Sequence, residues 1–320
     1  MKIKRILAVI LTAVLALTAV SCGSAAPADI NVAVIKGPTG VGMASLMDKN
    51  AKGEAANNYT FTLASAPDEV VAKFATEIDI AAVPTNLAAT LYKKMGGNVR
   101  ILAVNTLGVL SMLENGESVK TVADLKGKTI YTSGQGANPE YILRYVLEGN
   151  GIDPDKDVTI EFVGTNDELV AALVSGKAQI AMVPEPAATT VMTKVETLRR
   201  AFDMTDEWDK ISDQPLMMGC VIARADFLEA NEGAVKNFLK EYEESIAVCE
   251  DVETAAKLCE EQGIIPSAAV AAKAIPGCNV TYVAGKTMKE ALAAYYQVLF
   301  DGNPASIGGE IPDDAFYYLG

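Results

Sequence analysis

The sequence predicts an α/β protein of two lobes, each lobe a mostly parallel sheet flanked by helices. The first observation is that apolar, strand-like runs alternate with amphipathic helical segments, as in sheets whose parallel strands are joined by helices. The second is an internal repeat, because residues 59–90 resemble residues 158–189 at an offset of about 100 positions. A chain of 320 residues, half of them apolar, is long enough for both lobes.

The chain opens with the features of an export signal. Three basic residues precede the apolar run Ile6–Val20, which is shorter than the roughly 20 residues that a membrane-spanning helix needs. Small residues then lead to Cys22, and this pattern resembles a bacterial lipobox, whose cysteine is lipidated and becomes the mature N-terminus. We expect a signal peptide over residues 1–21, a lipidated tether over residues 22–30, and a protein anchored by lipid outside the cytoplasmic membrane, at the cell surface or in the periplasm. Ordinary cleavage near residues 19–21, with Cys22 left as a thiol, is the alternative.

Composition excludes several classes of function. The chain has a formal charge of −14, and −17 once the three basic residues of the signal are removed, so it repels nucleic acid and anionic lipid headgroups. It contains no histidine, which excludes Ser-His-Asp and Cys-His catalysis and zinc sites with histidine ligands. We expect no metal and no cofactor. Buried thiols or one disulfide, with the pairing open, are expected for the four cysteines that follow the tether, none of which forms a CxxC: Cys220, Cys249, Cys259 and Cys278.

The first strand of the mature chain, residues 30–35, runs into the Gly-rich stretch KGPTGVG. Gly37 and Gly42 have the spacing of a phosphate-binding loop, but Met43 and Ala44 stand where that loop has Lys and then Ser or Thr. A nucleotide site is therefore not expected. A strand, a Gly-rich turn and a helix with free N–H groups still suit a small anion or a polar group, and a plain tight turn is the alternative.

The two copies of the repeat predict the same succession of elements. In each, an alternating strand leads through a polar turn to a short helix, DEVVAKFA or DELVAALV, whose first turn holds acidic residues, as the helix dipole favours. A buried strand follows, IDIAAV or AQIAMV, and ends at a Val-Pro loop that opens another helix. Upstream, the second copy has its own strand and Gly-rich turn at residues 128–141, where Pro139 suits the first turn of a helix.

Two segments connect the predicted lobes. Residues 99–116 leave the first unit and enter the second, and residues 214–227 return. We therefore assign residues 31–106 together with 218–320 to lobe 1, and residues 107–217 to lobe 2. Two crossings make a more restrictive hinge than one linker does. Beyond the return, two segments with apolar side chains at helical spacing indicate core-facing helices.

The loops that follow the strands form the predicted ligand site, because ligands of open α/β sheets bind beyond the carboxyl ends of the strands. Each lobe offers two such loops, which would face each other across a shared cleft. Their polar side chains and N–H groups, with one asparagine at the crossing, are the candidate contacts: Lys36, Thr39, Gly40, Thr85, Asn86, Asn105, Ser133, Gln135, Asn138 and Glu185.

Several of these candidates have an alternative role. Thr39, Thr85 and Asn86 are residue types that also serve as helix N-caps. Lys36 either pairs with an anionic solute or is simply solvated. Glu185 either holds an amine or ring N–H of the solute, or caps the next helix or faces solvent. If Glu185 rather than Lys36 faces the cleft, an aminopyrimidine-like or cationic solute is favoured over a sulfonate.

With these elements in place, the sequence resembles the type II periplasmic binding proteins of the sulfonate/nitrate/thiamine-precursor branch, the SsuA/THI5-like family, which are solute receptors of ABC importers. The resemblance covers nearly the whole mature chain and rests on the lipobox at Cys22 and the motifs IKGPTGVG, IDIAAVPTN, VADLKGKTIYTSGQGANPEY, AQIAMVPEP and VIARADFLEANEGAVKNFL. It implies two lobes that close around a small polar organic solute, such as a sulfonate, nitrate or an aminopyrimidine. It also implies a monomer that delivers the solute to a membrane permease with its ATPase.

Two other functions stay open as alternatives. Relatives of this fold act as enzymes in menaquinone and pyrimidine biosynthesis, but the export signal and the absence of histidine favour a binding protein without enzymatic activity. The second alternative is a surface lipoprotein that senses or adheres and transports nothing.

Overall fold

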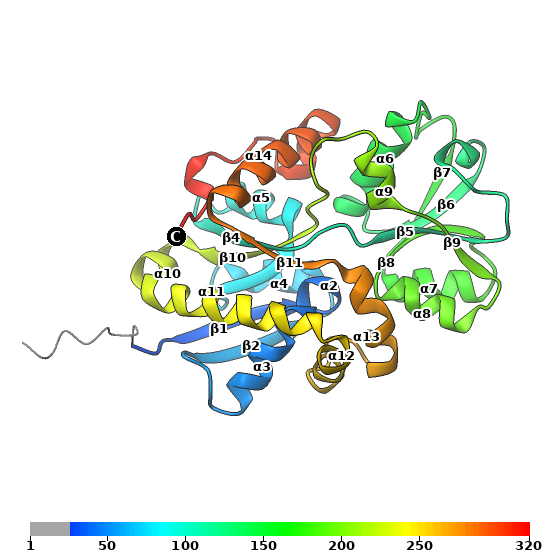
Figure 1. Ribbon diagram of the computed structural model, residues 1–320. Coiled ribbons are helices and arrows are strands. Elements are labelled where there is room, and N and C mark those ends of the chain that lie inside the picture. Colours follow the sequence, from blue (N-terminus) through cyan, green and yellow to red (C-terminus); the bar gives the residue numbers. More distant parts are fainter. Residues whose placement is uncertain (1–25) are drawn as a thin grey trace, which may run out of the picture.

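The computed structural model describes residues 26–320 of the chain. It has one sheet of six strands and one of five, with helices packed around each and two segments crossing between them (Figure 1). The predicted class, an α/β protein of two lobes, is confirmed. The predicted signal peptide and Cys22 lie outside the described residues, as does most of the predicted tether.

The first sheet combines strands from both ends of the chain. Its strands are β1 (Asp29–Ile35), β2 (Asn58–Ala64), β3 (Ile80–Pro84), β4 (Val99–Thr106), β10 (Gly219–Arg224) and β11 (Val280–Ala284). Their order is β11-β4-β10-β3-β1-β2. Strand β1 is parallel to β2 and β3, whereas β10 lies antiparallel between β3 and β4, and β11 lies antiparallel to β4. The sheet is therefore mixed rather than mostly parallel, because β10 and β11 belong to the returning part of the chain.

The second sheet repeats the arrangement of the first. Its strands are β5 (Leu110–Asn115), β6 (Thr129–Ser133), β7 (Thr159–Val163), β8 (Ile180–Pro184) and β9 (Leu198–Asp203), in the order β7-β6-β8-β5-β9. Strand β6 lies between β7 and β8 and is parallel to both, as β1 is to β2 and β3. Strand β5 is antiparallel to β8 and β9. The two-unit repeat that the sequence predicts is thus present in the topology.

Helices connect the strands and cover the sheets. Those that accompany the first sheet are α2 (Pro38–Val41), α3 (Ala44–Ala51), α4 (Pro67–Phe74), α5 (Thr85–Lys94), α10 (Ala225–Ala230), α11 (Glu232–Ala247), η2 (Val248–Glu250), α12 (Val252–Glu261), α13 (Ala268–Ala274), η3 (Ile275–Cys278), α14 (Gly285–Gly302), η4 (Pro304–Ile307) and η5 (Asp314–Phe316). Those that accompany the second are η1 (Val122–Leu125), α6 (Asn138–Gly149), α7 (Asn166–Val174), α8 (Ala187–Lys194) and α9 (Met204–Asp209).

The repeated helices α4 and α7 begin as the sequence predicts. Each has two acidic residues in its first turn, and the cap residue Thr165 of α7 accepts a hydrogen bond from the N–H of Glu168 (3.1 Å). Within residues 26–320, the helices are all too short or too polar to cross a membrane.

A hydrophobic core extends across both sheets on the side of α14. One continuous cluster includes Val83 of the first sheet and Met112 of the second. Trp208 of α9 is fully buried at this place, with its ring centroid 5.8 Å from that of Tyr295 on α14 and 4.6 Å from that of Tyr145 on α6. The two lobes are therefore joined by apolar packing as well as by the crossing segments.

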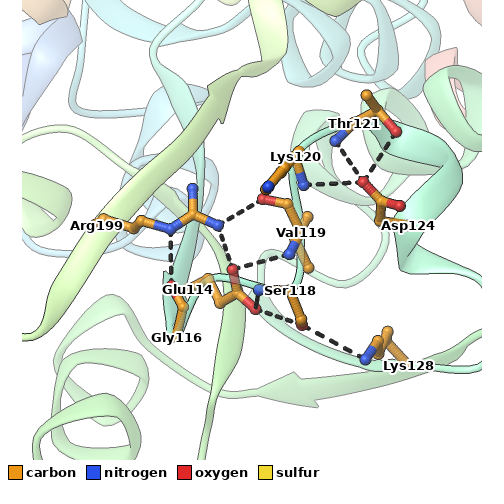
Figure 2. A network of polar contacts seen from close by, with 9 residues as sticks. All are labelled: Glu114, Gly116, Ser118, Val119, Lys120, Thr121, Asp124, Lys128 and Arg199. Carbon is orange, nitrogen blue, oxygen red and sulfur yellow. Dashed lines mark hydrogen bonds and ion pairs between the residues drawn. The ribbon is translucent and has the colours of Figure 1, made fainter.

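At one end of the second sheet, a network of polar contacts connects β5, the loop that follows it and β9 (Figure 2). Glu114, near the end of β5, is only 3% exposed and accepts hydrogen bonds from Ser118, the N–H of Val119 and Arg199. Burial alone would raise the pKa of Glu114, but the bonds from Ser118 and Val119 and the charge of Arg199 hold it below its usual value. Because Glu114 pairs with Ile180 at the start of β8, this network lies opposite the loop that follows β8.

Candidate ligand-binding site between the lobes

The loops at the carboxyl ends of the parallel strands come together between the two sheets. Asn138, at the start of α6, donates hydrogen bonds to Thr85 Oγ1 (3.1 Å) and to the carbonyl of Met218 (3.1 Å). A Cβ placed on Gly277 of η3 would lie 3.2 Å from Glu185 Cγ, which follows β8. We call this meeting place the inter-lobe junction, formed by residues 36–40, 84–86, 133–138, 184–186 and 277.

Thr85 is the centre of the hydrogen bonds across the junction. Its hydroxyl donates to the carbonyl of Met217 (2.7 Å) and accepts from Asn138, while its N–H donates to the carbonyl of Met218 (3.1 Å). Its own carbonyl accepts from the hydroxyl of Tyr296 on α14 (2.8 Å). Thr85 is fully buried, so it joins α5, the returning segment and α6 at one point.

Glu185 is buried at the junction with its charge already paired. One oxygen accepts from Arg200 Nη2 (2.8 Å) and the other from the N–H of Thr189 in α8 (3.0 Å). The carboxylate is 3% exposed, and Arg200 also lies 3.7 Å from Asp203. Glu185 thus lies between the lobes and bonds to the first turn of the next helix, which is the capping role considered from the sequence; its contact with a solute stays a prediction.

The Gly-rich turn uses much of its own hydrogen-bonding capacity. The N–H groups of Gly40 and Val41 both donate to the carbonyl of Gly37, at 2.9 and 3.2 Å. Gly37 has a φ of +108°, which favours glycine, and a Cβ on Gly40 would lie 2.6 Å from the carbonyl oxygen of Ile35. The turn is therefore built for tight packing, although it lies beside the second lobe: a Cβ on Gly37 would be 3.9 Å from Pro186.

Asn105 and Thr39 form a buried contact inside the first lobe. The side-chain nitrogen of Asn105 donates to the hydroxyl of Tyr242 on α11 (2.9 Å) and to the carbonyl of Thr39 (3.3 Å), and its oxygen accepts from Thr106 (3.0 Å). Asn105 is 1% exposed. The amide of Asn105 therefore holds the Gly-rich turn in place through the carbonyl of Thr39. Thr39 itself is half-buried.

The other candidates lie in different surroundings. Lys36 and Gln135 are exposed. The buried hydroxyl of Ser133 donates to Asn166 Oδ1 (2.6 Å), and the side-chain nitrogen of Asn86 donates to a carbonyl of η4 (3.4 Å). The oxygen of that Asn86 amide has no partner among the described residues. The structure thus brings Thr85, Asn138, Glu185 and the Gly-rich turn together, while the side chains of Lys36 and Gln135 are exposed to solvent.

Three residues of this region do not stand out in the sequence as site residues. Arg200 comes from β9 and Gly277 from η3, and neither belongs to a motif. Tyr295 belongs to the apolar face of α14, and such a face indicates a core residue. Its buried hydroxyl nevertheless has no hydrogen-bond partner within residues 26–320. Burial raises the pKa of Tyr295, and the next residue, Tyr296, donates to the carbonyl of Thr85, so this part of α14 lies beside the junction.

Two surface pockets are lined by residues outside the junction. One of about 300 Å³ lies between α6 and α14, lined by Tyr141, Arg144, Tyr145 and Leu299 among others. The other, of about 490 Å³, lies beside β11 and is lined by Ile246, Cys249, Pro276 and Tyr282 among others. The junction itself is closely packed where Gly277 meets Glu185.

The cysteines and acidic residues of the described part of the chain were compared with what a metal site requires. All four cysteines in the described part of the chain are free thiols, and burial raises the pKa of Cys249 to about 11. Residues 26–320 contain no group of three or more His, Cys, Asp or Glu side chains placed to hold a metal ion.

The sequence model of the family described as NMT1/THI5 like matches residues 65–252, which is more than half of the chain. The chain belongs to this family. No curated protein matches it. The resemblance that the sequence motifs indicate is therefore confirmed at the level of the family.

Solved structures share the fold over nearly the whole chain. An ABC transporter protein from Parabacteroides distasonis is 22% identical, with 90% of this chain and 98% of that chain covered and a TM-score of 0.75. The periplasmic aliphatic sulphonate binding protein SsuA from Escherichia coli is 18% identical, with 90% of this chain and 94% of that chain covered and a TM-score of 0.70. The alkanesulfonate-binding protein SsuA from Xanthomonas axonopodis pv. citri, bound to MOPS, is 17% identical, with 92% of this chain and 99% of that chain covered and a TM-score of 0.68. This chain thus has the fold of the type II periplasmic binding proteins.

Proposed function

We propose that this protein is the extracytoplasmic solute receptor of an ABC importer, which binds a small polar organic solute between its lobes and delivers it to a permease. Membership of the NMT1/THI5-like family and the fold shared with the SsuA proteins support this proposal. Burial raises the pKa of the four described thiols, which keeps them protonated, and the sequence has no histidine to activate them; both features support a protein that binds its solute and does not convert it.

The observation that carries the proposal is the inter-lobe junction. Loops from both sheets meet there, and Asn138 of one lobe bonds to Thr85 and Met218 of the other. A solute held at this place contacts both lobes when they are closed and one lobe when they are apart. It therefore stabilises the closed form by the contacts made only there, and the closed form is the one we expect to dock on the permease.

Further parts of the proposal concern the lobes and the anchor. We propose that residues 31–106 with 218–320 form one moving lobe and residues 107–217 the other. The assignment of β4 and β10 to the first sheet, and of β5 and β9 to the second, supports this division. We also propose that the protein is a monomer held to the membrane by a lipid on Cys22, after removal of residues 1–21.

Thermal unfolding of the purified protein against a solute panel tests the receptor function. The panel holds alkanesulfonates, taurine, nitrate, aminopyrimidines and amino acids. A solute at 100 times its Kd stabilises the fold by about 2.7 kcal/mol, which raises Tm by several degrees. A protein that shifts with no solute, and that releases no bound compound on denaturation, would refute the proposal.

A further inference from the structure

On the basis of the proposed receptor function, we infer that the junction selects neutral or cationic solutes that donate N–H hydrogen bonds, and excludes small anions such as sulfonates and nitrate. Three features carry this inference. They are a buried amide oxygen that lacks a donor among the described residues, helix N-termini at which several N–H groups are already bonded within the chain, and a buried carboxylate whose cation is shared with a second acid.

The side-chain amide of Asn138 presents an oxygen that needs a donor. Its nitrogen is identified by its partners, because the carbonyl of Met218 can only accept and Thr85 Oγ1 gives its own hydrogen to the carbonyl of Met217. The remaining atom, Asn138 Oδ1, is buried and has no partner in the part of the chain that the structure describes. Buried amide oxygens are nearly always bonded, so this one indicates a donor that comes from a ligand.

Several of the N–H groups that an anion would use are bonded within the chain. In the Gly-rich turn, two of them donate to the carbonyl of Gly37. At the start of α5 the N–H of Thr85 donates to a carbonyl of the returning segment, and in the first turn of α8 the N–H of Thr189 donates to Glu185. Helices α2 and α6 each carry a proline in their first two positions, and proline has no N–H. An anion held at these helix starts therefore finds four of the N–H groups already bonded within the chain.

The charges at the junction also act against an anion. Glu185 is a buried carboxylate, and the guanidinium of Arg200 that pairs with it is shared with Asp203. Two carboxylates and one guanidinium leave this group with one net negative charge, so a sulfonate placed beside Glu185 would meet a like charge in a poorly hydrated place. Lys36 is exposed to solvent, where water screens its ammonium. An amine, an amide or a ring N–H meets no such repulsion and can donate to Asn138 Oδ1.

The test compares solutes in matched pairs that differ in charge but little in shape. Methanesulfonate is paired with methanesulfonamide, nicotinate with nicotinamide, and pyrimidine-4-carboxylate with its carboxamide. Binding to the purified full-length protein is measured by calorimetry, with nitrate and 4-aminopyrimidine as further probes. We expect the uncharged members that bind to do so at least ~10-fold more tightly than their anions, since a buried acceptor left unpaired discriminates strongly. Anions that bind as well or better overturn the inference and leave the receptor function standing.

The compound that stays with the protein during purification gives a second readout if none of these probes binds. It is released by denaturation and identified by mass spectrometry. A compound with N–H groups and no net negative charge supports the inference, and an anion overturns it. A protein that is empty and binds no solute refutes the receptor function itself, and the inference falls with it.

A variant tests the role of the amide oxygen. Asn138→Leu keeps a side chain of similar size, and we expect it to weaken binding of the N–H solute at least ~10-fold and to reduce the preference over the matched anion. Thr85→Val removes the hydrogen bond from Asn138 to Thr85 but keeps Asn138 Oδ1, so it should keep that preference. Asn150→Leu, at the end of the same helix α6, is the control for folding. If Asn138→Leu keeps the preference for the uncharged solute over its matched anion, then Asn138 Oδ1 does not accept a hydrogen bond from the solute.

Discussion

A leucine at Gly277 is expected to hold the two lobes apart. A Cβ at this position would lie 3.2 Å from Glu185 Cγ and 3.4 Å from Glu185 Oε1, and leucine adds three further carbons on the same side. Glu185 cannot simply turn away, because Arg200 and the N–H of Thr189 hold its two oxygens. The clash is present when the junction is closed and is relieved when the lobes separate, so it opposes closure without opposing the fold of either lobe.

The size of this effect follows from the overpacking. Inserting extra methylene groups into a packed site costs about 1–3 kcal/mol. Because only the closed, solute-bound form bears this strain, the apparent affinity of Gly277→Leu should fall about 5- to 150-fold. Calorimetry measures the loss, and small-angle scattering should show a larger radius of gyration for the variant.

The control for this experiment is Gly302→Leu at the end of α14. A Cβ there has no heavy atom within 4 Å among residues 26–320, so this variant should bind as the parent protein does. If Gly277→Leu keeps the parent affinity and the parent radius, then solute does not bind in the closed junction and the argument from packing is wrong.

Two further predictions concern the polar network of the second sheet and the anchor. Glu114→Gln should lower the free energy of unfolding by about 1–3 kcal/mol at pH 7, because hydrogen bonds to a charged group are replaced by weaker ones. Since folding lowers the pKa of Glu114 from 4.5, this difference from the parent should persist above pH 4.5 and shrink as the pH falls through the lowered pKa, and a difference that grows on acidification would contradict it. Cys22→Ala should move the protein from the membrane to the soluble fraction, with Cys249→Ala as the control that stays bound. Retention of Cys22→Ala in the membrane would rule out the lipid anchor.

The internal repeat makes the site loops predictable from the sequence. Each Val-Pro loop ends a strand that runs parallel to the first strand of its unit, so both loops lie at the carboxyl edge of their sheets. Thr85 follows β3 and Glu185 follows β8, as this pattern requires. Asn138 follows the second Gly-rich turn in the same way. Alternation of apolar residues and an internal repeat are both visible in the sequence itself, so these positions can be found without a structure.

The partners of these side chains are set by distant contacts that no local pattern encodes. Asn105 bonds to Tyr242, 137 residues further along the chain, and Glu185 bonds to Arg200 on another strand. The antiparallel place of β10 between β3 and β4 is likewise a pairing between segments that are far apart in sequence. For this reason the sequence predicts which residues stand near the site, but not which of them still have an atom available for a solute.

The position of β10 also governs the order in which the chain can fold. Strand β10 begins at Gly219 and is the neighbour of both β3 and β4. Until this segment has been synthesised, or has emerged from an export channel, β3 and β4 each present an unpaired edge and the first sheet cannot be completed. Folding is slow when the strands that pair in a sheet are far apart in the sequence. The strands of the second sheet, by contrast, all lie between residues 110 and 203, so that sheet can form before the first one is complete.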